Sequence, residues 1–138
     1  MSYPKNGASK YKTTSIESAS KEMILIMLYE GAIRNIKLGI KATEEKRIAD
    51  KGLYLGKAHD IVSELMNSLD HRVGGNLSKD LETLYIYIID KITEGNIKND
   101  VECFNSVITV LNTLLDGWKD ALDSLKKERS EKLKVSKL

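Results

Sequence analysis

Two histidines and one cysteine are the side chains of this 138-residue chain best suited to metal binding or nucleophilic chemistry. A carboxylate-bridged metal site in a helical bundle needs Glu-x-x-His pairs that project from facing helices. Neither His59 nor His71 has a glutamate three residues before it, and both fall on the polar side of an expected helix. Cys103 has no obvious adjacent base, so a small half-buried thiol is the simpler interpretation. We therefore predict no metal site, no cofactor and no enzymatic activity.

Phosphate and nucleic-acid binding are also disfavoured. The pair Gly74-Gly75 lacks the lysine and the preceding strand that a phosphate-binding loop needs. Positive charge gathers at the two ends of the chain, and residues 126–138 carry six lysine or arginine residues against two glutamates. No basic stripe on one helix face is interleaved with stacking aromatics, so the charge pattern is not that of a nucleic-acid-binding protein.

The composition favours a cytoplasmic chain with a single globular domain. The longest apolar run is far shorter than a membrane span, and the polar first residues do not resemble a signal peptide. Cys103 is the single cysteine, which rules out a disulfide within one chain. A chain of this length can bury a sizeable core.

Apolar residues recur at steps of three and four in four segments, which predicts four helices. Because the connections between them are short, we expect an all-α, antiparallel up-down-up-down four-helix bundle. Residues 1–19 form a mobile N-terminal arm or short capping helix, residues 20–127 the bundle, and residues 128–138 a basic C-terminal tail. The expected helices run from Ser20, as the N-cap, to about Thr43; from Lys51 to Arg72, with Gly74-Gly75 as the stop; from Asn76 or Ser78 to Gly95-Asn96; and from Asn99 or Asp100 to about Lys127.

Each expected helix has an apolar stripe that should face the core. The first stripe is Ile24, Leu28, Ala32, Ile36 and Ile40, and the second is Leu55, Ala58, Ile61, Val62, Leu65, Met66 and Leu69. The third is Leu77, Leu81, Leu84, Tyr85, Ile88 and Ile92, and the fourth is Phe104, Val107, Ile108, Leu111, Leu115, Trp118, Leu122 and Leu125.

The chain also has apolar residues outside these stripes. Seven apolar residues in a row, Met23–Tyr29, point all round a helix, so one face cannot bury them all. The residues outside the expected core are Met23, Ile26, Ile86, Val110 and Leu114. As a set they predict a groove for an amphipathic helix or an extended apolar segment. A homodimer that hides the same residues against a second copy is the alternative.

Five blocks, in order, resemble the flagellin-specific export chaperone family (FliS). They are LYEGAI (Leu28–Ile33), KAHDIVSELMNSLD (Lys57–Asp70), GGNLSKDLETLYIYI (Gly74–Ile88), EGNIKND (Glu94–Asp100) and LLDGWKDAL around Trp118. The resemblance covers roughly Tyr11 to Leu125. One departure is Lys21 after Ser20, where the family usually has a proline, and the basic tail is not a family hallmark.

The resemblance implies a cytoplasmic chaperone of type III flagellar export that binds the disordered C-terminal segment of flagellin. Such a chaperone prevents premature polymerisation, delivers flagellin to the export gate, has a co-chaperone or regulator as a further partner, and is a monomer when bound to flagellin. The N-terminal arm would cover part of the groove, with Tyr11 and Ile16 as its apolar anchors. The expected flagellin groove consists of Met23, Ile26, Tyr29, Ile33, Tyr85, Ile86, Ile89, Cys103, Val110, Leu114, Gly117 and Ala121.

Overall fold

The chain forms four helices and, within residues 7–137, no strand. The computed structural model describes the backbone of residues 7–137 and the side chains of residues 21–137. The helices are α1 (Gly7–Glu44), α2 (Ile48–Asn67), α3 (His71–Lys98) and α4 (Val101–Ser136). This confirms the expected all-α four-helix bundle.

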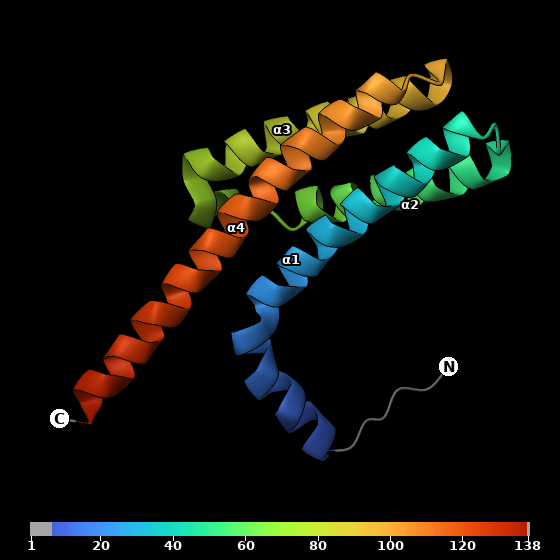
Figure 1. The fold of residues 1–138 in the computed structure, drawn as a ribbon. Helices are drawn as coiled ribbons and strands as arrows, with labels where there is room; N and C mark the ends of the chain where they lie inside the picture. Colours follow the sequence, from blue (N-terminus) through green and yellow to red (C-terminus); the bar gives the residue numbers. More distant parts are fainter. Residues whose placement is uncertain (1–6, 138) are drawn as a thin grey trace.

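Each helix packs against two others, so the four form a closed ring around one core. Figure 1 shows this bundle from the side. α1 packs against α2 and α4, while α3 packs against α2 and α4 from the opposite corner. Because short connections join the helices, each runs antiparallel to the next, as expected for an up-down-up-down bundle. Within the described part of the chain, none of the helices combines the length and apolar character needed to cross a lipid bilayer.

The start of α1 and the end of α4 differ from the expected boundaries. α1 begins at Gly7, so Ser20 lies within this helix and is not its N-cap. α4 continues to Ser136, well past the expected end near Lys127. The physical reason is the same at both ends, because residues 8–19 and 128–136 contain no glycine or proline that would stop a helix. The expected arm anchors, Tyr11 and Ile16, lie outside the residues whose side chains are described.

The connection between α2 and α3 also differs from the expected one. α2 ends at Asn67, and Asp70 caps α3 by accepting a hydrogen bond from the Arg72 amide at 3.0 Å. Gly74-Gly75 therefore does not end the second helix, and neither Asn76 nor Ser78 is the cap. The glycines instead form a kink inside α3, where Gly75 has φ 54° and ψ −127°, a combination that only glycine adopts readily.

The connection between α3 and α4 uses two adjacent residues in different ways. Asn99 is the left-handed C-cap of α3, with φ 51°. Asp100 is the N-cap of α4 and accepts a hydrogen bond from the Glu102 amide at 3.0 Å. The second of the two expected caps is therefore the one that the structure uses.

The core confirms most of the expected stripes on α2, α3 and α4, but the buried face of α1 is different. Its buried residues are Ile26, Tyr29, Ala32, Ile33, Ile36 and Ala42. Ile26 was expected on the polar face but is buried, whereas Ile24 was expected in the core and is 51% exposed. Seven consecutive apolar residues fit several rotations of the helix equally well, and the chosen rotation places Tyr29 in the centre of the bundle. Leu77 and Leu125 are also exposed rather than buried.

Candidate partner-binding surface

Five of the twelve residues expected to line the groove are interior residues. These are Ile26, Tyr29, Ile33, Tyr85 and Cys103. They belong to the packed centre of the bundle, so a partner that docks on the outside of this structure does not touch them. The other seven residues remain on the surface or at its edge.

Tyr29 and Tyr85 join α1 and α3 across the core. Their hydroxyls are hydrogen-bonded, and their ring centroids lie 6.4 Å apart at an angle of 47°. Burial raises the pKa of Tyr29, whereas the hydrogen bond with Tyr85 and the nearby Trp118 indole lower it. Burial, followed by the hydrogen bond with Tyr29, raises the pKa of Tyr85. Both phenols are therefore neutral at ordinary pH, and the pair is a structural link between the two helices.

Trp118 approaches this pair from α4. Its Nε1 atom is buried and has no hydrogen-bond partner among the described residues. The indole is close enough to Tyr29 to lower the pKa of that phenol, but the N–H does not point at the hydroxyl with hydrogen-bond geometry. The polar centre of the bundle thus draws on three of the four helices.

The first group of outward apolar residues belongs to α3 and α4. Ile86 is 47% exposed, and Ile89, Val110 and Leu114 are half-buried. The last three also pack against the core with their inner sides. We call these outward residues together the α3–α4 strip; it has an α3 part, Ile86 and Ile89, and an α4 part, Val110, Leu114, Gly117 and Ala121.

Helix periodicity places the strip residues of each helix on one face, but the two faces are not turned toward each other. Within each helix these residues recur at steps of three, four or seven, so they share one face. Gly95 packs against Cys103 of α4, and Val110 follows Cys103 by two helical turns, so the α4 residues of the strip lie on the side of α4 that faces α3. Thr93, which shares a face of α3 with Ile86 and Ile89, lines a pocket with Gly52 and Gly56 of α2, so these two isoleucines lie on the α2 side of α3. Open space surrounds the position where a side chain at Gly117 would begin. The α4 part of the strip can therefore accept bulky apolar side chains from a partner.

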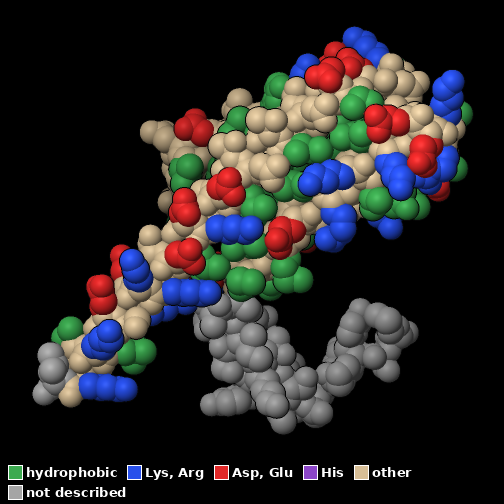
Figure 2. Space-filling view, viewed as in Figure 1, with side chains coloured by type: hydrophobic (Ala, Val, Ile, Leu, Met, Phe, Trp, Pro, Cys, Tyr) green, Lys and Arg blue, Asp and Glu red, His purple; other side chains and the backbone are tan. Residues whose placement is uncertain are grey.

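The second apolar surface lies at the start of the described part of α1. Met23, Ile24 and Met27 are 43%, 51% and 63% exposed, and we call them the α1 patch. In Figure 2, hydrophobic side chains gather at the lower end of the bundle, beside the grey atoms. Sequence reasoning included Met23 but missed Ile24 and Met27, although the seven-residue apolar run was a signal for them.

A small apolar pocket opens at the same end of the bundle, where α2 passes into α3. It has a volume of about 250 Å³, and its apolar lining includes Leu69, Val73, Leu77, Leu81 and Trp118. We call it the end pocket. Sequence reasoning missed it because helical periodicity places both Leu77 and Trp118 in the core stripes. The kink at Gly75 carries Val73 and Leu77 to the surface, and no periodic pattern indicates that.

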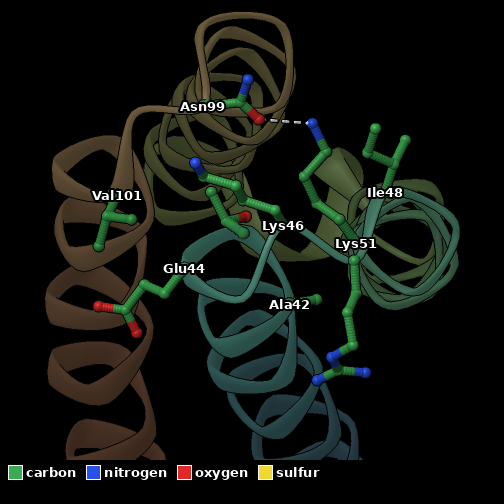
Figure 3. A pocket seen from close by; sticks show the side chains of 9 residues that line it. Ala42, Glu44, Lys46, Ile48, Lys51, Asn99 and Val101 are labelled. Atoms are coloured by element: carbon green, nitrogen blue, oxygen red, sulfur yellow. Dashed lines mark hydrogen bonds between the residues drawn. The ribbon is translucent and has the colours of Figure 1, made fainter.

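A more polar pocket of about 420 Å³ lies at the opposite end of the bundle, between the α1–α2 and α3–α4 connections (Figure 3). Lys51 spans the two connections: its Nζ atom donates to Asn99 Oδ1 at 2.7 Å and to the Asn96 carbonyl at 3.1 Å (Figure 3 shows the first). Arg47 pairs with Glu45 and Asp50. The Lys51 contacts join the two connections. Lys51 and Arg47 are therefore already engaged by other residues of the chain.

Metal-binding and nucleophilic groups do not converge in the described residues. No group of three or more His, Cys, Asp or Glu side chains there is placed to hold a metal ion. His71 contacts Glu82 at 3.2 Å, and His59 lies on another helix. Burial, followed by the charge of Asp100, raises the pKa of the Cys103 thiol, which disfavours the thiolate.

Comparison with known proteins identifies close relatives. Residues 4–125 match the model of the family described as flagellar protein FliS. A flagellar secretion chaperone FliS of Vibrio cholerae is 36% identical over 112 residues, covering 78% of this chain and 82% of the relative. The FliS of Bacillus subtilis is 30% identical over 124 residues, covering 90% of this chain and 92% of the relative. The FliSB of Pseudomonas aeruginosa is 30% identical over 120 residues, covering 84% and 95%.

Proposed function

Since this chain belongs to the FliS family and its relatives are flagellar secretion chaperones, we propose that it binds the disordered C-terminal segment of flagellin. It holds that segment in the cytoplasm, prevents premature polymerisation and helps to deliver flagellin to the export gate. It works by binding alone, so release at the gate depends on the partners and not on a reaction catalysed by this chain.

The observation that carries this proposal is the apolar surface left uncovered on the bundle. The α1 patch and Ile86 are exposed, and the half-buried residues of the α3–α4 strip keep their outer sides uncovered while their inner sides pack against the core. A segment that folds on binding must offset an ordering cost of about 2–5 kcal/mol or more. Burial of a few hundred Å² of apolar surface at about 25 cal/mol per Å² supplies a free energy of that size.

The arrangement of the two surfaces favours a long guest that wraps the bundle. α1 and α3 occupy opposite corners of the ring, so the α1 patch and the α3–α4 strip face different directions. One segment that touches both must pass around the outside of the bundle. We assign the binding role to Met23, Ile24 and Met27 at one site and to Ile86, Ile89, Val110, Leu114, Gly117 and Ala121 at the other. A further part of this proposal is that residues 1–19, through Tyr11 and Ile16, cover one of these surfaces until flagellin arrives.

A titration with a flagellin C-terminal peptide tests the proposal. We expect a 1:1 complex by calorimetry and a gain in helicity by circular dichroism that exceeds the sum of the two separate spectra. A peptide with the same composition in scrambled order is the control. Absence of a complex, or equal binding of the scrambled peptide, would contradict the proposal.

A homodimer that buries the same apolar surfaces is the second candidate, and exposure of Met27 and Ile86 favours it equally. Peptide competition separates the two. A chain that is dimeric through these surfaces must dissociate when the peptide binds, whereas a free binding surface leaves the oligomeric state unchanged.

A further inference from the structure

The outward face of α4 carries charges of both signs in two separate blocks. Six exposed residues follow one another at steps of four and three, which places them along one stripe of the helix. They are Asp116, Asp120, Asp123, Lys127, Ser130 and Lys134. The stripe is acidic where α4 packs in the bundle and basic where α4 extends beyond it.

The basic half of this stripe belongs to a part of α4 that projects from the bundle. The family match ends at residue 125, whereas the helix continues to Ser136. Figure 1 shows this end of α4 leaving the other helices, and Figure 2 shows charged side chains along it. Arg129, on another side of the helix, lies 3.6 Å from Glu22 of α1. None of the five charged stripe residues forms an ion pair with the described part of the chain.

The stripe of one α4 helix is complementary in charge to the same stripe of a second copy that runs in the opposite direction. If two α4 helices lie antiparallel with a two-fold axis beside residue 125, every charged stripe position except Asp120 meets an opposite charge. Asp120 meets Ser130 of the other copy. The opposing charges are Asp116 with Lys134 and Asp123 with Lys127. By symmetry each pair occurs twice, as an isologous interface requires.

The projecting end of α4 makes this pairing sterically possible. The stripe lies opposite the buried face of α4, which includes Leu111, Leu115 and Leu122, so the two bundles would sit on the outer sides of the helix pair. The extension of each copy then lies along the bundle half of its partner's α4. Gly117 and Ala121 of the α3–α4 strip are on another side of the helix and stay uncovered.

We propose that two copies of the free chain associate through this stripe, antiparallel and about a two-fold axis near residue 125. The interface contains no apolar residue, and exposed ion pairs are individually weak and screened by salt. The association is therefore weak and depends on ionic strength. The face concerned is distinct from the proposed flagellin-binding surfaces, so this proposal stands or fails independently of the proposed function.

Sedimentation velocity of the full chain at low and high ionic strength tests the proposal. We expect dimers at about 20 mM salt and monomers at about 500 mM salt, because the Debye length shrinks from roughly 20 Å to below 5 Å. The double variant Lys127→Glu, Lys134→Glu should raise the dimer dissociation constant at low salt by at least about tenfold. The variant Asp116→Lys, Asp123→Lys should do the same.

A charge-swap mixture provides the decisive measurement. Each double variant repels itself, but in a mixed dimer all four pairs again join opposite charges, two with the original sign and two with reversed sign, so an equimolar mixture should form mixed dimers. Lys57→Glu with Lys132→Glu is the matched control, since it changes the net charge equally with both residues exposed and off the stripe. A wild-type chain that stays monomeric at low salt would overturn the proposal, as would a mixture that stays monomeric or a control that dissociates like the stripe variants. Far-UV circular dichroism confirms that each variant is folded.

Discussion

At the scale of the residue, exposure separates apolar side chains that hold the bundle together from those available to a partner. Ile86 and Ile88 are two positions apart on α3, yet Ile86 is 47% exposed and Ile88 is fully buried. A step of two residues turns a helix by about 200°, so the neighbours point in nearly opposite directions. Equal substitutions at these two positions should therefore have opposite consequences.

We expect Ile86→Asp to weaken binding of the flagellin peptide by about tenfold or more while changing the free energy of unfolding by only about 0.5 kcal/mol. Ile88→Asp, the matched variant, buries a charge in the core and should unfold the chain or lower its midpoint severely. Thermal melts and peptide titrations measure both effects. A severe loss of stability in Ile86→Asp would place Ile86 in the core and remove it from the binding surface.

The buried tyrosine pair gives the stability of the bundle a dependence on alkaline pH. Burial raises the pKa of Tyr29 and Tyr85, whereas in the unfolded chain both phenols titrate near their ordinary value of about 10. Below pH 10 both states are protonated and the full stability is present. Above it the unfolded chain releases protons that the folded chain keeps, so stability falls as pH rises.

Urea unfolding between about pH 9 and 11 should therefore show a steeper loss of stability for the wild type than for Tyr85→Phe. One tyrosine contributes at most about 1.4 kcal/mol per pH unit. Tyr54→Phe is the control, because Tyr54 is half-buried and outside the core cluster. Equal slopes for the wild type and Tyr85→Phe would show that the Tyr85 phenol ionises within the folded bundle.

At the scale of the element, the kink in α3 determines what the α2–α3 end of the bundle exposes. Gly75 has a backbone conformation that an L side chain strongly disfavours, and the adjacent Gly74 leaves no room for a Cβ, which would lie 2.6 Å from the Ser78 Cβ atom. The kink lets a short first turn, capped by Asp70, precede the long part of α3. Val73 and Leu77 consequently line the end pocket instead of entering the core.

We expect Gly75→Ala to lower the free energy of unfolding by about 1–3 kcal/mol. Gly56→Ala is the matched control: Gly56 lies inside α2, a Cβ there meets nothing within 4 Å, and alanine should stabilise the helix by up to about 1 kcal/mol. Urea midpoints of the two variants should thus move in opposite directions. An unchanged midpoint for Gly75→Ala would mean that the kink relaxes without cost.

At the scale of the whole molecule, the bundle presents its two exposed apolar surfaces in different directions. Met27 of the α1 patch and Ile86 of the α3–α4 strip stand on helices at opposite corners of the ring. They have no common partner, so their substitutions should act independently. For a guest that wraps the bundle, the two substitutions together should therefore raise the dissociation constant by the product of their separate fold-changes.

We expect Met27→Asp and Ile86→Asp to weaken binding of the full flagellin segment multiplicatively, within about twofold. Two shorter peptides, taken from the two halves of the segment, should respond to one substitution each. Calorimetric titration of all four combinations measures this. A guest confined to a single surface would reveal itself if either substitution had no effect on the full segment.

The sequence by itself determined the number, order and approximate extent of the helices, because amphipathic periodicity is a local property. It determined the buried stripes of α2 and α4 almost completely, and the order of its motifs indicated the family. Tertiary structure alone decided which rotation of α1 is buried, because seven apolar residues in a row satisfy several rotations and only packing around Tyr29 and Tyr85 selects one. For the same reason, only the packing of the helices decided which of the expected groove residues are buried and which are at the surface. The kink at Gly75 was beyond prediction as well, since a glycine pair can end a helix or bend one, and the neighbouring Asp70 cap and buried Ser78 decided between them.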